Sequence, residues 1–302
     1  MTPRQGAGAR SAELLLLATV FLYALNFTTV KYGLDNGFGS LVYASLRFVG
    51  GALVFVALAG ARERTFRIER RDVPAIAFMA LVGIFGNQLC LVIGLRHAAA
   101  STFALLFGTF PIWVALWSRV AGLESLRRRH LVAALISFAG VALVALGGEH
   151  GIDGDFVGIA LALGAPATWA MYSVAAGRVV ASYSPYRLSA VVLVLGVVPL
   201  VAAGGPELAH QDWGAPNALA WLSLASSIVL SLVVSNITWF RAIDRVKSAR
   251  ASLYANLTPF VGAVLALVLL SESFGPLQVV GGIVIAVGIL VVRRRQAATA
   301  PE

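Results

Sequence analysis

Acidic side chains are scarce in this sequence, and none of them lies in the middle of a long apolar run. Only 14 of the 302 residues are Asp or Glu, and all charged residues together make up 12%. A single cysteine, Cys90, excludes an intramolecular disulfide. Cysteines and histidines are not grouped at the spacings typical of metal ligands. We therefore expect no disulfide, no metal and no cofactor.

The same scarcity argues against catalysis. A membrane-embedded transferase or hydrolase needs a positioned base, a nucleophile or a metal site. The sequence contains neither a clustered pair of aspartates nor a His-Glu-x-x-His pattern. We predict that the protein is not an enzyme. A membrane-embedded enzyme, a channel and a scaffold for other membrane proteins stay as alternatives of another class.

Apolar residues dominate instead, at 59% of the chain, with a mean hydropathy of +0.85. A hydrocarbon core of about 30 Å is crossed by roughly 20 apolar residues in a helix. The apolar runs lack the strict alternation of a membrane β-barrel. We predict an all-α integral membrane protein with ten transmembrane helices, near residues 12–33, 40–59, 73–95, 99–121, 129–147, 156–177, 185–204, 217–243, 248–270 and 275–292.

Basic residues are concentrated in alternate loops. The chain has 23 Lys and Arg and a net charge of +9. If the N-terminus is cytoplasmic, all of them except Lys31, Arg47 and Arg96 fall on the cytoplasmic side, as the positive-inside rule requires. We therefore predict that both termini are cytoplasmic. The charge is that of a membrane topology signal, so we expect membrane lipid as a partner, no nucleic acid, and no obligatory protein partner.

The two halves of the sequence align with an offset of 148 residues. This offset places Pro259 on Pro111 and Asn236 on Gln88. It also pairs Ser235 with Asn87, Glu272 with Glu124 and Gly288 with Gly140. A constant offset that matches prolines, acids and amides indicates a duplication. We predict two five-helix repeats, residues 1–150 and 151–302.

Five is an odd number of spans, so the second copy must enter the membrane in the opposite direction. Two halves that are inverted about an axis in the membrane plane are typical of secondary transporters. Such halves can rock against each other and open a central site to each side in turn, with two states of similar energy. The predicted class is therefore a carrier.

The segments that repeat also resemble a known family. They are YALNFTTVKYGL in the first span, ASLRFVGG in the second, FGTFPIWVALWSRVAGLESL in the fourth and NLTPFVGAVLALVLLSESF in the ninth. With ISFAGVALVALG and GGIVIAVGILVVRRR, which close the halves, they resemble the drug/metabolite transporter superfamily with its EamA-type repeats. The resemblance is strongest to bacterial exporters of amino acids, including aromatic ones. It implies an exporter in the bacterial inner (cell) membrane.

The intramembrane side chains limit the substrate and the coupling. Polyamines or organic cations would need carboxylates, and phosphorylated compounds would need several fixed cations. Amides, hydroxyls and aromatic rings suit small neutral or zwitterionic molecules such as amino acids. Drugs, nucleosides and other metabolites are the alternative substrates. Without a midplane carboxylate or histidine, we expect facilitated diffusion, or coupling that uses no titrating midplane carboxylate.

Candidate binding residues are uncharged polar or aromatic side chains within the spans. In the first span Tyr23 and Asn26 share one helix face. The alternative interpretation is that the amides only bond neighbouring helices, at about 1 kcal/mol each. The complete set of predicted cavity-lining residues is Tyr23, Asn26, Asn87, Gln88, Trp169, Tyr172, Ser235, Asn236, Trp239, Tyr254 and Asn256.

Two prolines and two cations complete the candidates. Pro111 and Pro259 each remove a helical hydrogen bond at matching places of the repeats, which predicts paired hinges. Lys31 and Arg47 lie on the outer half of the first two spans as possible outer-gate cations. Lys31 can instead extend its ammonium to the head groups, and Arg47 can instead cap carbonyls of a neighbouring helix.

Overall fold

The computed structural model describes residues 3–122, 128–147, 151–180, 182–238, 257–273 and 275–293. All regular structure in these residues is helical, including two π-helical segments, η1 and η2. In chain order the elements are α1 (Pro3–Asp35), α2 (Ser40–Glu63), α3 (Val73–Phe78), η1 (Met79–Gly86), α4 (Asn87–His97), α5 (Ala100–Phe107), α6 (Phe110–Val120), α7 (Arg128–Leu146), α8 (Gly151–Val179), α9 (Pro185–His210), α10 (Ala218–Ser226), η2 (Ser227–Val234), α13 (Thr258–Leu269) and α14 (Pro276–Arg293).

Most of the predicted apolar spans are helices of membrane-crossing length. Within the described part of the chain, six helical stretches are long and apolar enough to cross a bilayer, and a bent pair of helices brings the number to seven. Three shorter apolar helices lie in α7, α13 and α14. The protein is therefore a helical membrane protein.

The fourth predicted span is not one straight helix, contrary to the expectation for residues 99–121. It is divided into α5 and α6, which meet at an angle of 43°. At the end of α5 the N–H groups of Gly108 and Thr109 donate to the carbonyls three residues back. These are hydrogen bonds of the 3₁₀ type, and the α-helix ends there. Pro111, in the first turn of α6, has no N–H to continue the earlier helix. The break is thus local in origin.

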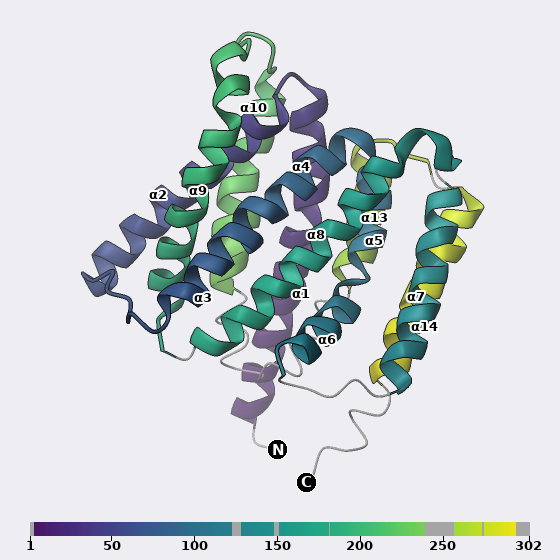
Figure 1. The fold of residues 1–302 in the computed structure, drawn as a ribbon, viewed down its shortest axis with the longest axis horizontal. Helices are drawn as coiled ribbons and strands as arrows, with labels where there is room; N and C mark the ends of the chain where they lie inside the picture. The colour runs from purple at the N-terminus through teal and green to yellow at the C-terminus, as the bar shows by residue number, and fades with distance from the viewer. Residues whose placement is uncertain are drawn as a thin grey trace.

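Helices that are far apart in the sequence pack side by side. The main partners are α7 with α14, α2 with α9 and α4 with α8. Figure 1 shows α7 and α14 together at one edge of the bundle. In the same view the chain runs upwards through α1 and downwards through α8, so the two helices have opposite directions. Two glycines permit the α7–α14 contact, because a Cβ on Gly281 would lie 2.6 Å from the carbonyl oxygen of Gly140.

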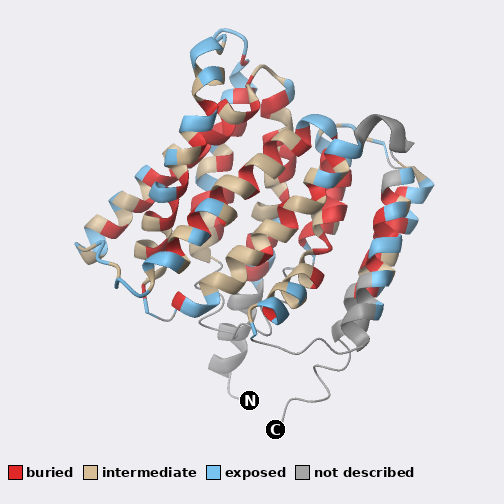
Figure 2. Ribbon diagram, in the orientation of Figure 1, coloured by how far each residue is buried: buried red, intermediate tan, exposed pale blue. Residues whose placement is uncertain are grey.

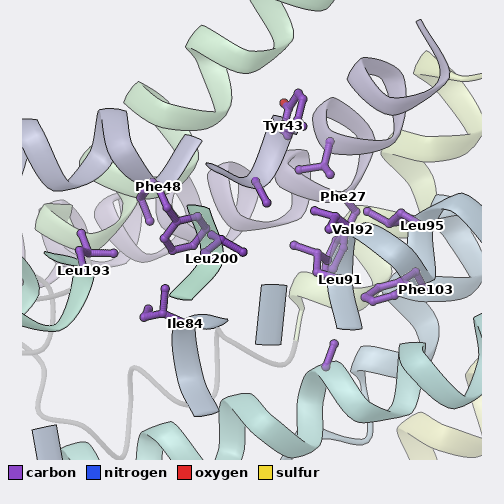
Figure 3. Close-up of a cluster of buried hydrophobic side chains, with 14 of the residues drawn as sticks. Phe27, Tyr43, Phe48, Ile84, Leu91, Val92, Leu95, Phe103, Leu193 and Leu200 are labelled. Carbon is purple, nitrogen blue, oxygen red and sulfur yellow. The ribbon is translucent and has the colours of Figure 1, made fainter. Parts of the chain in front are cut away.

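The interior between α1, α2, η1, α4, α5 and α9 is apolar and aromatic. Figure 3 shows side chains of α1, α2, η1, α4, α5 and α9 that meet there, among them Phe27 and Phe103, whose ring centroids are 5.9 Å apart. Large apolar side chains are also exposed on outward faces, for example Leu53, Leu135 and Leu222. Figure 2 shows this alternation of buried inner and exposed outer faces. An apolar exterior is what contact with lipid requires.

Acidic residues at helix ends hold the short connections. Both carboxylate oxygens of Glu272 accept hydrogen bonds from the first N–H groups of α5, Ala100 at 2.8 Å and Ser101 at 2.9 Å. A single oxygen of Glu207 in α9, Oε2, accepts from both Leu41 and Val42 at the start of α2. A carboxylate at a helix N-terminus satisfies unpaired N–H groups and meets the positive end of the helix dipole. These two acids are structural.

Candidate functional site

Polar residues from the first and eighth predicted spans meet in what we call the α1–η2 cluster: Tyr23, Asn26, Ser227, Ser235 and Asn236. The Tyr23 hydroxyl donates to Oδ1 of Asn236 at 3.3 Å. The Ser227 hydroxyl donates to Oδ1 of Asn26 at 3.1 Å. Ser235 is completely buried, whereas Tyr23, Asn26 and Asn236 are half-buried. The structure therefore brings four predicted residues together with Ser227, which the sequence analysis did not select.

A second group, the Gln88 relay, links three helices through Arg47, Gln88, Asn87 and Thr168. Arg47 of α2 donates to Oε1 of Gln88 at 3.3 Å. Nε2 of Gln88 donates to Oδ1 of Asn87 at 3.2 Å. Nδ2 of Asn87 then donates to α8, to Oγ1 of Thr168 at 3.1 Å and to the carbonyl of Ala165 at 2.8 Å. Arg47 thus bonds a side-chain amide and not the backbone carbonyls that the sequence analysis had offered as one alternative.

Two predicted aromatic residues of α8 stack on each other next to η1. The rings of Trp169 and Tyr172 are 4.7 Å apart between centroids and nearly parallel, at 9°. The side chain of Tyr172 lies directly on Gly83, where any Cβ would collide with it. The Tyr172 hydroxyl is close enough to that of Tyr23 for a charge on one to affect the other, which places the aromatic pair near the α1–η2 cluster. Both rings are half-buried.

Each polar pair of the third and eighth predicted spans directly follows a π-helical segment. Met79–Gly86 precedes Asn87 and Gln88, and Ser227–Val234 precedes Ser235 and Asn236. The bounds of the second segment are each 148 higher than those of the first, which is the repeat offset. In both, the N–H after the segment bonds the carbonyl five residues back, that of Val82 or of Leu230.

The π-helical segments also have corresponding neighbours. The segment η1 packs against α8 and α9, and η2 packs against α1 and α2. Each segment therefore contacts the first two helices of the opposite half. Single π turns are frequent at functional sites, because they re-aim the side chains that follow. The sequence does not indicate these segments, since nothing in an apolar run distinguishes a π-turn from an α-turn. Only the repeat offset signals that the two places correspond.

The cation Lys31 has structural partners. Its ammonium donates to the carbonyl of Leu95 at 2.8 Å and pairs with Asp35 at 3.4 Å. Leu95 lies in the last turn of α4, where a cation meets the negative end of the helix dipole. The ammonium is therefore bound within the protein, whereas the sequence analysis had considered extension to the head groups.

Both predicted hinge prolines lie at the start of a helix. Pro111 is the second residue of α6, after the 43° bend, and Pro259 is the second residue of α13. A Cβ on Gly108, at the bend, would lie 3.6 Å from Cγ of Pro259, so the corresponding points of the two repeats are close to each other. The hinge role stays a prediction. The predicted residues Trp239, Tyr254 and Asn256 lie outside the described residues.

Chemically, these groups can bind and orient, and they include no carboxylate, histidine or cysteine. The α1–η2 cluster supplies amide and hydroxyl groups, the relay adds amides and one guanidinium, and the aromatic pair adds two ring faces. No group of three or more His, Cys, Asp or Glu residues that could hold a metal occurs in the part of the chain that the structure describes. The arrangement suits recognition of a small polar molecule with an apolar part.

Comparison with known proteins gives a consistent result. A model of the EamA-like transporter family matches residues 10–146 and again residues 156–294. A probable terminal-alkyne amino-acid exporter of Streptantibioticus cattleyicolor is 30% identical over 285 residues, which cover 93% of this chain and 92% of that protein. An uncharacterized transporter of Archaeoglobus fulgidus is 23% identical, with coverage of 94% and 99%. One solved crystal structure shares the fold, with a TM-score of 0.66 at 18% identity and coverage of 96% and 99%.

Proposed function

The chain belongs to the EamA-like transporter family, and from this premise we propose that it is a secondary transporter of small neutral or zwitterionic metabolites, above all amino acids including aromatic ones. The observation that carries the proposal is the α1–η2 cluster beside the Trp169–Tyr172 stack. It combines uncharged hydrogen-bonding groups with aromatic faces, which match the polar and apolar parts of an amino acid. The similarity to a probable terminal-alkyne amino-acid exporter supports this substrate class.

We infer a topology of ten transmembrane helices in two inverted five-helix repeats, residues 1–150 and 151–302, with both termini in the cytoplasm of a bacterial cell. Three observations support it: the distribution of basic residues, the opposite directions of α1 and α8, and the 148-residue offset of the two π-helical segments. A cysteine-accessibility assay at single sites in alternate loops tests the topology directly.

The proposed transport cycle is alternating access, and corresponding weak points in the two halves support it. Each half has a π-helical segment in its third helix and a proline that begins a helix segment in its fourth. If a π-helical segment returns to the α-form, the polar pair that follows it in the chain rotates about the helix axis. Because η1 and η2 contact the first two helices of the opposite half, such a change would be transmitted across the pseudosymmetry axis.

We propose that transport does not depend on a titrating midplane carboxylate, so the protein acts as a facilitator or as an exporter with another coupling. The described residues of the α1–η2 cluster and of the Gln88 relay include no Asp, Glu or His. An imposed pH gradient across proteoliposomes should therefore give no accumulation. Strong accumulation driven by that gradient, lost on neutralising one Asp or Glu, would contradict this part.

The central experiment is counterflow in proteoliposomes with a panel of amino acids, nucleosides and organic cations. Saturable exchange limited to amino acids is the expected result. Exchange of nucleosides or drugs alone would replace the substrate class, and large single-channel currents would indicate a channel. The binding site is tested by Ser227→Ala, which removes the hydrogen bond to Asn26 and should lower the apparent affinity about fivefold.

The neighbouring serine supplies a matched control. The hydroxyl of Ser226 donates to the carbonyl of Ser223 within its own helix and not to a side chain of the α1–η2 cluster. Ser226→Ala should leave exchange unchanged. Equal effects of the two substitutions would show that the cluster is not where substrate binds.

A further inference from the structure

Arg47 is a buried cation that has no anionic partner among the described residues. It is the eighth residue of α2, about 10 Å along the helix from Ser40, and only 5% of its surface is exposed. Its guanidinium donates a hydrogen bond to the neutral oxygen Oε1 of Gln88, and its Nε has no partner among the described residues. Among the residues that the structure describes, no carboxylate forms an ion pair with it.

Other arginines of the described chain are differently placed. Arg187 forms an ion pair with Glu63 at 2.8 Å. Arg96 donates to the carbonyl of Phe38 at 2.6 Å, in the connection between α1 and α2. A guanidinium has five N–H donors in a planar fork that fits a carboxylate with two parallel bonds. Arg47 keeps most of these donors uncommitted in a place where an unpaired charge is costly.

The relay behind Gln88 directs its oxygen towards Arg47. The amide nitrogen of Gln88 is engaged by Asn87, and the amide nitrogen of Asn87 is engaged by α8. Gln88 can therefore present only its oxygen to the guanidinium. A glutamate at this position would have neutralised the charge, whereas the glutamine holds Arg47 in place and leaves its positive charge available.

The relay ends next to the aromatic pair. Thr168, its last member, is followed directly by Trp169, and Tyr172 lies four residues further on the same face of α8. The relay therefore connects a fixed positive charge on α2 with two stacked rings on α8. A molecule that carries a carboxylate at one end and an aromatic or apolar group at the other matches both.

We propose that Arg47 binds the carboxylate of the transported substrate, so that a carboxylate is the group by which this carrier selects its substrates. The inference deepens the proposed transport function and rests on it. It narrows the class from neutral or zwitterionic metabolites to carboxylates, with amino acids as the members that also fit the aromatic pair. Amines that lack the carboxylate are poor substrates.

The test compares L-phenylalanine with phenethylamine and L-phenylalaninamide on the full-length protein in proteoliposomes. Binding is read from thermal stabilisation in detergent, and transport from counterflow of labelled L-phenylalanine. A charge-assisted pair lost from a buried site corresponds to about a ten- to hundredfold lower affinity. Wild-type protein should therefore bind both analogues at least tenfold more weakly than L-phenylalanine. Arg47→Gln should remove this preference, and Arg47→Lys should retain part of it.

A second variant addresses the case in which Arg47→Gln does not fold. Gln88→Glu places a carboxylate within 3.3 Å of the guanidinium, at the position of the present amide. An internal counter-ion should raise the unfolding temperature and at the same time weaken L-phenylalanine binding at least tenfold. Arg62→Gln, on the same helix and bonded to the Tyr186 hydroxyl, is the matched control and should change neither quantity.

The outcomes separate the two proposals. If wild-type protein exchanges L-phenylalanine and phenethylamine equally well, or if Gln88→Glu binds L-phenylalanine like wild type, the assignment of Arg47 is wrong and the carrier function stands. If wild-type protein exchanges no amino acid, and nucleosides or drugs are exchanged instead, both the proposed substrate class and the role of Arg47 are overturned.

Discussion

Gly83 of η1 lies against the Tyr172 side chain, and we predict that Gly83→Ala destabilises the protein and weakens substrate binding. A Cβ at position 83 would lie 2.3 Å from Cδ2 of Tyr172 and 2.5 Å from its Cβ, and contacts below 3.0 Å are essentially never seen. Because the Cβ of Tyr172 is attached to the backbone of α8, rotation of the ring alone cannot relieve the clash. Either α8 moves away from η1, or Tyr172 changes its position relative to Trp169.

The magnitude follows from a comparison with Gly86 in the same segment. A Cβ on Gly86 meets only the carbonyl oxygen of Leu81, at 3.4 Å, which is an ordinary contact. Both substitutions gain about 0.5–1 kcal/mol from the lower entropy of the unfolded chain. Only Gly83→Ala adds the overpacking cost of about 1–3 kcal/mol. We therefore expect Gly83→Ala to be less stable than Gly86→Ala by about 1–3 kcal/mol.

The assay is equilibrium unfolding of both purified variants in detergent, followed by circular dichroism, together with counterflow of the best substrate from the panel. Gly83→Ala should also lower the apparent affinity, since the aromatic pair is displaced, and Gly86→Ala should not. If the two variants unfold at the same denaturant concentration and transport equally well, the close approach of Tyr172 to η1 is not a feature of the native protein.

Three further predictions concern contacts outside the binding site. Glu272→Gln replaces a charged acceptor of two α5 N–H groups by one that can accept with a single oxygen, and should cost about 1 kcal/mol in the same unfolding assay. Gly281→Ala drives a Cβ against the backbone of Gly140 at 2.6 Å and should loosen α14 from α7, seen as faster amide hydrogen exchange in both helices. The hydrogen bond to Asp72, with a smaller effect of burial, raises the pKa of Tyr183. The neutral phenol thus stabilises the fold below the ordinary tyrosine pKa near 10, and this stability is lost as the pH rises through the higher folded-state value. Tyr183→Phe should therefore show a smaller alkaline fall of the unfolding midpoint than wild type.

The candidate site shows where inference from the sequence is strong and where it stops. Asn26, Asn236, Asn87 and Gln88 could be selected because an amide within an apolar run is conspicuous. Their bonding partners could not be selected, since a partner is set by the rotation and depth of another helix. Ser227, one of many small hydroxyl residues in the chain, was missed for this reason, although its hydroxyl is bonded to Asn26.

The break between α5 and α6 illustrates the same limit for the backbone. Pro111 indicated a weak point, but proline is tolerated within membrane helices, and Pro166 and Pro199 lie inside α8 and α9 without ending them. Whether a proline bends, ends or begins a helix depends on what satisfies the freed carbonyls. The sequence alone does not show which groups bond to those carbonyls.

Membrane residence, the approximate positions of the apolar helices and the duplication follow from the sequence by itself. Each of the three depends on composition along the chain or on a constant offset. None of them requires knowledge of a distant contact. The tertiary structure alone decided that Arg47 bonds the amide of Gln88, that Tyr172 rests on Gly83, and that η1 and η2 are π-helical. Burial of apolar surface sets which residues enter the membrane, whereas directional hydrogen bonds and close packing between helices set how the polar residues meet there.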